Sequence, residues 1–283
     1  MAKSWKIHFN WLHFLLIILL ALGIFFRFVN LDRKVYWVDE TATSLRISGY
    51  SFADVGKLIS NGIVSNEDVQ RYQRTNADKN VINTIQSLAV DVPQHPPLYF
   101  VMARIWVQWF GNSVAVTRSL SALFSLLVFP CLYWLCLELF ERPLVGWVAI
   151  ALIAVSPFHV LYAQEARQYS LWTVTILLSS AALLRAMRLK SKLSWGIYAA
   201  TLALSFYISL LSGLVAIGHG IYVLITENFR LRKTFNAYLL STFAGFIVFM
   251  PWVFVVITNL SSATDTLAWT LSYKPKPALI QMW

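Results

Sequence analysis

Long apolar runs alternate with short polar stretches along most of this chain. The first run ends near Val29, and six more follow it, at Val114 to Leu139, Leu144 to Tyr162, Ser170 to Met187, Trp195 to Leu211, Gly213 to Thr226 and Ala237 to Thr258. A helix that crosses a bilayer needs about 20 mostly apolar residues. The pattern therefore predicts an all-α protein, a polytopic transmembrane helical bundle with about seven spans. The closing segment "ALIQMW" looks like the start of another.

The first apolar run has the charge pattern of a signal peptide, because Lys3 and Lys6 precede it. However, the run is long enough to cross a membrane, and no small-x-small cleavage site follows it. We therefore expect an uncleaved first span.

Basic residues in the short loops orient these spans. Lys3 and Lys6, Arg142, the cluster from Arg185 to Lys192 and the cluster from Arg230 to Lys233 all fall on one side if the spans alternate. Short loops rich in Lys and Arg stay in the cytoplasm. We expect a multi-pass protein of the cell (plasma) membrane with a cytoplasmic N-terminus.

One long polar region, residues 31–113, then lies on the extracytoplasmic side. Its segment "PPLYFVMARIWVQWFG" (Pro96 to Gly111) is short for a span, carries Arg104 and is rich in aromatic residues. These features favour a helix that lies at the membrane interface. We expect residues 31–113 to form a large first extracytoplasmic loop with interfacial helices, inside one transmembrane domain that covers residues 1–283.

The composition agrees with a membrane protein and excludes other classes. The 283 residues are 58% hydrophobic and only 13% charged, far from the balance of a soluble domain. The net charge of +10 does not indicate nucleic-acid binding, because many of the basic residues lie in short loops between apolar runs. Cys131 and Cys136 fall inside one apolar run and indicate neither a disulfide nor a metal pair.

Polar residues whose side chains can take part in a reaction gather on the predicted outer side. Asp39 and Glu40 follow the first span, Gln94 and His95 precede the aromatic segment, and "YAQEARQYS" (Tyr162 to Ser170) joins two later spans. Each also has a structural explanation: the Asp-Glu pair suits the first turn of a helix, and Glu165 with Arg167 suits an ion pair in a turn. Arg27 suits a side chain that extends to the lipid headgroups.

Taken in order, these motifs resemble a known family of membrane enzymes. The pattern W-x-D-E (Trp37 to Glu40), "HPPLYF", "WFGNSVAVTRSLSALFSLL", "SPFHVLYAQEARQYSL" and "FMPWVF" is similar to the GT-C glycosyltransferases, in the branch of protein O-mannosyltransferase-like and aminoarabinose-transferase-like enzymes called family 39. The resemblance implies transfer of a sugar from a polyprenyl-phosphate donor to an acceptor hydroxyl at the outer face, with inversion. Relatives are usually longer, so we expect this chain to be the N-terminal part of the full fold.

The resemblance also implies roles for particular residues. Asp39 would be the catalytic base, and Glu40 would help to hold the acceptor or orient the site. Arg167 is the first candidate to stabilise the leaving phosphate, and His95 is the second. Glu165 would orient Arg167. Tyr162 and Tyr169 would line the path of the sugar or lipid. Inverting transfer requires a carboxylate on the face of the sugar opposite the leaving group.

We predict no cofactor. A divalent metal at the Asp-Glu pair is left unassigned, because two adjacent carboxylates without further clear oxygen ligands make an incomplete coordination shell for a divalent cation. The expected partners are the lipid bilayer, a polyprenyl-phosphate-linked sugar and a protein, lipid or glycan acceptor. A polytopic transporter or lipid-sugar flippase is the alternative function, as is an inactive truncated family member. A transporter would place its ionisable groups near the bilayer midplane.

Overall fold

The computed structural model describes residues 11–60, 62–230 and 233–272, and this part of the chain is helical, with no strand. The helices are α1 (Trp11–Phe28), α2 (Val38–Ile47), α3 (Phe52–Ser60), α4 (Asn66–Arg71), α5 (Val81–Asp91), α6 (Leu98–Phe110), α7 (Val114–Phe140), α8 (Pro143–Ala154), α9 (Pro157–Ala163), α10 (Tyr169–Leu189), α11 (Lys192–Phe206), α12 (Ser212–Thr226), α13 (Lys233–Thr258) and α14 (Leu260–Ser272). The all-α prediction is confirmed for these residues. Lys3, Lys6, Arg232 and the "ALIQMW" segment lie outside them.

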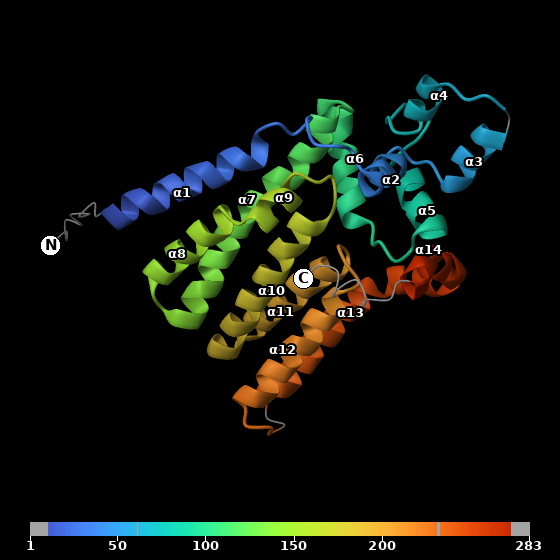
Figure 1. Cartoon of the computed structure of the whole chain (residues 1–283). Helices are drawn as coiled ribbons and strands as arrows, with labels where there is room; N and C mark the ends of the chain where they lie inside the picture. The colour runs from blue at the N-terminus through green and yellow to red at the C-terminus, as the bar shows by residue number, and fades with distance from the viewer. Residues whose placement is uncertain (1–10, 61, 231–232, 273–283) are drawn as a thin grey trace.

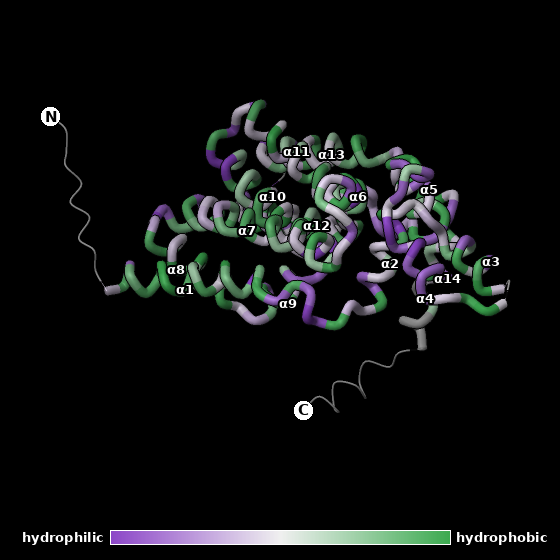
Figure 2. Tube along the Cα trace, turned by 90° about the horizontal axis from the view of Figure 1, so that it is seen from above, coloured by the Kyte–Doolittle hydropathy of each residue, from purple (hydrophilic) through white to green (hydrophobic). Residues whose placement is uncertain are grey.

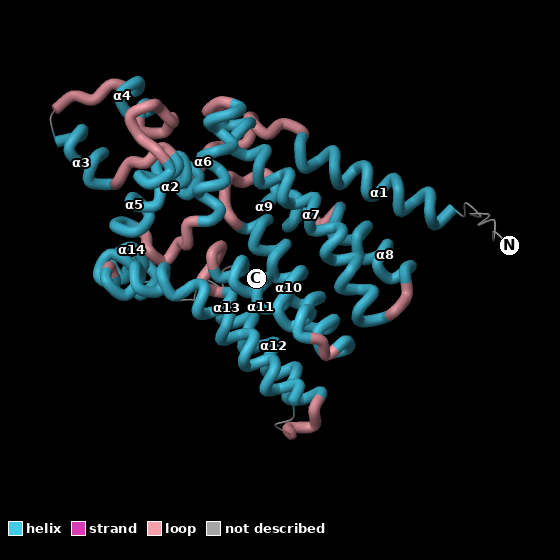
Figure 3. The backbone as a smooth tube through the Cα atoms, turned by 180° about the vertical axis from the view of Figure 1, so that it is seen from behind, coloured by secondary structure: helices cyan, strands magenta, loops and turns pink. Residues whose placement is uncertain are grey.

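A bundle of long apolar helices forms the body of the protein. Within the described residues, α1, α7, α10 and α13 are each long and apolar enough to cross a membrane, and the bent pair α8–α9 raises the number to five if it counts as one span. The seven predicted spans fall mostly on helices, but the Leu144 to Tyr162 run is broken between α8 and α9, and the Trp195 to Leu211 run continues past the end of α11 at Phe206. Figures 1 and 3 show α10 to α13 packed side by side, with the α7–α8, α10–α11 and α12–α13 connections at the same end of the bundle. The chain is therefore a multi-pass membrane protein.

Helices α2 to α6 gather at the other end of the bundle (Figure 1). Figure 2 shows that hydrophilic positions concentrate over this cluster, whereas α1 is mostly hydrophobic. The polar stretch after Ser65 includes the short helix α4, whose first turn is capped by the Ser65 and Asp68 side chains. The cluster sits above one end of the bundle and supplies several of the candidate site residues.

The aromatic helix α6, expected at the membrane interface, is packed inside the cluster of α2 to α6. Tyr99 and Phe100 are buried, and only its end, at Trp109 and Phe110, is well exposed. Arg104 is fully buried and donates hydrogen bonds to the backbone carbonyls of Ile47 and Lys79. Arg104 therefore stabilises the cluster, which explains a charge in an apolar helix.

Arg27 also differs from its prediction, because it does not extend to the headgroups. The α8–α9 pair bends by 65° at residues 155–156, which leaves carbonyls at the end of α8 without helical partners. The buried Arg27 guanidinium donates to the Ile153 and Ala154 carbonyls, and it lies over the Phe129 ring at 5.1 Å. Unsatisfied carbonyls are costly in a membrane, so Arg27 stabilises the break.

Candidate active site

The Asp-Glu pair occupies the first turn of α2, as the capping interpretation predicts. Glu40 is the third residue of the helix, and its carboxylate accepts a hydrogen bond from the Trp37 backbone N–H at 3.4 Å. Carboxylates are stabilised at this position by the exposed N–H groups of the first turn. The helical geometry separates the two side chains, because adjacent residues of a helix point about 100° apart. Asp39 and Glu40 consequently have different surroundings.

Glu40 is fully buried and paired with Arg118 of α7. Its two carboxylate oxygens accept hydrogen bonds from Arg118 Nε at 2.8 Å and Nη2 at 2.6 Å, and the Ala166 N–H donates another at 2.9 Å. Arg118 also donates to three carbonyls of the segment before α2, those of Leu31, Lys34 and Val35. Of the two roles expected for Glu40, this geometry favours orientation of the site over contact with an acceptor.

Asp39 is the accessible carboxylate of the pair, with a side chain 38% exposed. Arg167 Nη2 lies 3.8 Å from its Oδ2 atom, and Arg167 Nη1 is 3.4 Å from the Thr43 hydroxyl. The Arg167 side chain is buried and its Nε has no hydrogen-bond partner among the described residues. A carboxylate beside a guanidinium with donors to spare suits both proton abstraction and the binding of an anion.

The expected ion pair between Glu165 and Arg167 does not form. Glu165 instead pairs with Lys34 at 2.8 Å, while Arg167 turns toward Asp39. Only backbone atoms join the two residues, through the Arg167 N–H and the Glu165 carbonyl at 2.7 Å. The short turn between α9 and α10 points the two side chains at different parts of the segment around α2, so the turn is tied down at two places. Glu165 therefore orients Lys34 and not Arg167.

His95 lies near Arg167 but is a poor cation. Its Nδ1 atom is 3.4 Å from Gln168 Nε2, and its ring packs against Phe100 at 6.1 Å between ring centres. Burial, together with the positive charges of Arg167 and Arg46, lowers the pKa of His95 to about 3. The imidazole is neutral at physiological pH, which leaves Arg167 as the cation next to Asp39.

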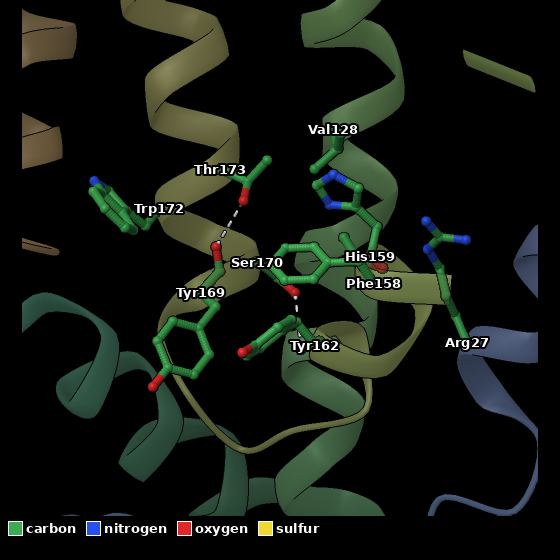
Figure 4. A pocket seen from close by; sticks show the side chains of 10 residues that line it. Arg27, Val128, Phe158, His159, Tyr162, Tyr169, Ser170, Trp172 and Thr173 are labelled. Atoms are coloured by element: carbon green, nitrogen blue, oxygen red, sulfur yellow. Dashed lines mark hydrogen bonds between the residues drawn. The ribbon is translucent and has the colours of Figure 1, made fainter. Parts of the chain in front are cut away.

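A cavity of about 230 Å³ opens beside this group, and Tyr162 and Tyr169 line it (Figure 4). The two rings meet edge to face at 4.9 Å, and the Tyr169 ring also lies 5.7 Å from the Arg167 guanidinium carbon. The remaining walls come from α1, α7, α9 and α10 and include Arg27, Ser125, Val128, Phe158, His159, Ser170, Trp172 and Thr173. Tyr169 thus stands between the cavity and the Asp39–Arg167 pair.

The structure brings the predicted residues to one end of the bundle but groups them differently. Asp39, Arg167 and His95 surround one polar region, Tyr162 and Tyr169 face the adjoining cavity, and Glu40 and Glu165 bind basic partners. The sequence analysis missed Arg118 and Lys34, although a lone arginine in the predicted span from Val114 signals a buried partner. Among the described residues, no three His, Cys, Asp or Glu side chains gather as a metal-ligand set.

Comparison with known proteins identifies one family. The family model described as dolichyl-phosphate-mannose-protein mannosyltransferase matches residues 94–254, more than half of the chain. The match includes His95, Arg118, Glu165 and Arg167 and begins after Asp39 and Glu40. No curated protein and no solved structure matches the chain with significance.

Proposed function

Because the chain belongs to the dolichyl-phosphate-mannose-protein mannosyltransferase family, a family of GT-C membrane glycosyltransferases, we propose that it transfers a sugar from a polyprenyl-phosphate donor to an acceptor hydroxyl, with inversion. The carrying observation is the half-exposed Asp39 carboxylate, 3.8 Å from the Arg167 guanidinium and next to an aromatic-lined cavity. The reaction takes the lipid-linked sugar as its donor substrate and invokes no cofactor.

In the proposed reaction, Asp39 accepts the proton of the acceptor hydroxyl. The acceptor oxygen forms the new bond to the anomeric carbon while the bond from that carbon to the phosphate oxygen breaks. The polyprenyl phosphate leaves as an anion, and Arg167 stabilises its charge. The Asp39–Arg167 contact of 3.8 Å is longer than a hydrogen bond, and the two side chains have to move apart for a sugar to lie between them. His95, being neutral, acts as a hydrogen-bonding neighbour.

The supporting residues hold this arrangement in place. Glu40 and Arg118 fix the start of α2, and therefore Asp39, against α7. Glu165 and Lys34 tie the α9–α10 turn to the segment that follows α1. Tyr162 and Tyr169 provide flat apolar faces for a sugar or an isoprenoid chain. Catalytic groups need such rigid support, because small displacements of a reacting group cost much of the rate.

We place the site on the extracytoplasmic face of the plasma membrane. The seven predicted spans, with α8–α9 as one broken span and α11 and α12 as short ones, put the α7–α8, α10–α11 and α12–α13 connections on the opposite side. These connections carry Arg142, Lys190, Lys192 and Arg230, as expected for cytoplasmic loops. Residues 31–113 are then the first outer loop of a single transmembrane domain, and its helices α2 to α6 cover the site.

Replacement of Asp39 by Asn tests the proposed base. We expect donor turnover to fall by about 10²- to 10⁴-fold, the usual contribution of a general base. The measurement is release of label from radiolabelled dolichyl-phosphate mannose, the donor named in the family description, and from other polyprenyl-phosphate sugars, in vesicles that contain the purified protein and an acceptor mixture.

Asp32→Asn is the matched control, because Asp32 is an exposed carboxylate in the same segment and forms no ion pair with the described residues. Thermal unfolding should show that both variants remain folded. Turnover by Asp39→Asn at the level of Asp32→Asn would contradict the base assignment. Absence of turnover by the wild-type protein with every lipid-linked sugar would contradict the transfer reaction itself.

A further inference from the structure

A groove runs between α11 and α13, at a distance from the candidate active site. Two adjoining cavities of about 520 and 510 Å³ lie there and share Gly196, Ala199 and Ala244. The helices approach closely at Gly245, where an added Cβ would lie 2.9 Å from the Ala199 carbonyl oxygen. Small side chains on both helices therefore leave an open channel along the bundle, which extends to Tyr207.

Three lysines surround one end of the groove. Lys190, Lys192 and Lys233 line the first cavity, come from the α10–α11 connection and the starts of α11 and α13, and are exposed. None of them forms an ion pair with another described residue. This end of the groove therefore concentrates positive charge that the described protein does not neutralise.

Three buried polar side chains line the same cavity without a partner. Trp195, Thr234 and Ser241 are 7 to 8% exposed, and within the described part of the chain none of their side chains forms a hydrogen bond. Their polar atoms are not among the fully buried, unpartnered atoms of the described residues, so each keeps some accessible surface. The indole N–H and the two hydroxyls are thus available to a polar ligand that enters beside the lysines.

The far end of the groove has a different character. Its walls are mostly apolar, from residues such as Ala203, Leu204 and Val248, and Tyr207 also lines it. The groove thus combines a cationic, hydrogen-bonding end with a long apolar end. A phospholipid has the same two parts, a phosphate headgroup and apolar acyl chains.

We propose that this groove binds one anionic phospholipid from the leaflet at the basic-loop side of the membrane. The lysines and the Trp195, Thr234 and Ser241 side chains hold its headgroup phosphate, and one acyl chain lies along α11 and α13. Basic pockets between membrane helices on the cytoplasmic side bind anionic headgroups. An apolar helix from a second copy would cover the lysines without neutralising them, which is costly. The proposal does not depend on sugar transfer.

Binding of phosphatidylglycerol by the purified full chain tests this site. Native mass spectrometry in mild detergent gives the affinity for dioleoyl-phosphatidylglycerol and for dioleoyl-phosphatidylcholine. We expect one tight phosphatidylglycerol per protein and weaker phosphatidylcholine binding. In Lys190→Gln/Lys233→Gln the phosphatidylglycerol affinity should fall about 10- to 30-fold, since each lysine near an anionic surface contributes roughly a factor of five.

Arg142→Gln/Arg230→Gln is the matched control, because it removes two exposed charges at the same end of the bundle that do not line the groove. We expect it to bind within twofold of wild type. Ala244→Phe fills the part shared by both cavities and should also weaken binding, whereas Ala21→Phe on the exposed side of α1 should not. Glycerol phosphate, which has a phosphate but no acyl chain, should not compete.

Several results would overturn the proposal. Equal losses in the two charge variants would mean attraction to the surface and not to the groove. Competition by glycerol phosphate would mean a simple phosphate site, and unchanged binding by Ala244→Phe would place the acyl chain elsewhere. A dimer with no bound lipid that Ala244→Phe dissociates would mean that a second copy occupies the groove.

Discussion

At the scale of residues, two adjacent carboxylates with opposite surroundings define the candidate site. Glu40 has no exposed surface and is bound by Arg118, whereas Asp39 remains accessible beside Arg167. A buried ion pair contributes to stability only while both partners are present. The pair thus divides into a supporting residue and a candidate reacting residue.

The Glu40–Arg118 pair leads to a stability prediction. Arg118→Met leaves a buried carboxylate unpaired and should destabilise the protein by about 3–5 kcal/mol, measured as a large fall in the thermal unfolding midpoint in detergent. Arg33→Met, at an exposed site, should change it little. Glu40→Gln/Arg118→Met removes the unpaired charge and should be more stable than Arg118→Met alone. A double variant that is no more stable would contradict this account.

His95 leads to a prediction about pH. Because its pKa is lowered to about 3 in the folded protein and is about 6.5 in an unfolded chain, the unfolded state binds the proton between these values. The stability of the fold should therefore decrease as the pH falls from 6.5 toward 3. Thermal unfolding at pH 7.5 and 4.5 measures this loss, which should be smaller in His95→Gln. An equal loss in that variant would assign the effect to other groups.

Residue types and their order were enough to propose the region of the candidate site, but the side-chain partners were less predictable. The helix-capping position of Glu40 follows from local sequence, because acidic residues favour a first helical turn. The Arg118 pairing joins residues 78 positions apart, and the exchange of partners by Glu165 depends on how the α9–α10 turn is placed. Such contacts depend on tertiary packing, and the spacing of residues along the sequence does not predict them.

At the scale of helices, the contact between α1 and the broken span α8–α9 is sterically tight. An added Cβ at Gly23 would lie 2.4 Å from the Ala154 carbonyl oxygen, and Arg27 binds the same carbonyl from the next turn of α1. A glycine at position 23 thus lets the two helices approach closely enough for Arg27 to reach the carbonyls at the break.

Gly23→Ala should consequently lower the thermal unfolding midpoint by several degrees. Gly218→Ala is the control, since Gly218 also lies within a helix and an added Cβ there meets nothing within 4 Å. In an open helical position this change stabilises by up to about 1 kcal/mol, so Gly218→Ala should be neutral or slightly stabilising. The same effect of both substitutions would show that α1 does not pack as tightly on α8 as described.

Hydrophobic runs predicted the helices well but not their breaks. Leu144 to Tyr162 appears as one continuous run, yet Ser156 and Pro157 end α8 and begin α9. Proline disfavours a helical conformation in the preceding residue and fits the first position of a new helix. The Ser-Pro pair in "VSPFH" therefore predicts the break, whereas the hydrophobicity of the run alone does not.

At the scale of the whole molecule, the proposed orientation predicts which loops a membrane-impermeant reagent can reach. With Cys131 and Cys136 replaced by Ser, a cysteine at Asn66 should be labelled by an impermeant thiol reagent in intact cells, and one at Lys190 only after permeabilisation. The positive-inside rule is the physical reason. The reverse pattern would invert the topology and move the candidate site to the cytoplasmic face.

The alternation of apolar runs was enough to predict the bundle, because membrane helices must satisfy their backbone internally and therefore appear in the local sequence. The placement of α6 was not predictable in the same way. Its aromatic residues suit both a membrane interface and a protein core, and only the burial of Arg104 between carbonyls of Ile47 and Lys79 distinguishes the two.

The Glu40–Arg118 pair also has a consequence for biosynthesis. Arg118 is the fifth residue of α7, a helix that has to enter the lipid. In the proposed orientation, Glu40 enters the membrane 78 residues ahead of Arg118 and therefore crosses to the outer side first. The order of translation therefore supplies the carboxylate before the cation, and the arginine meets its counter-ion as its own helix inserts.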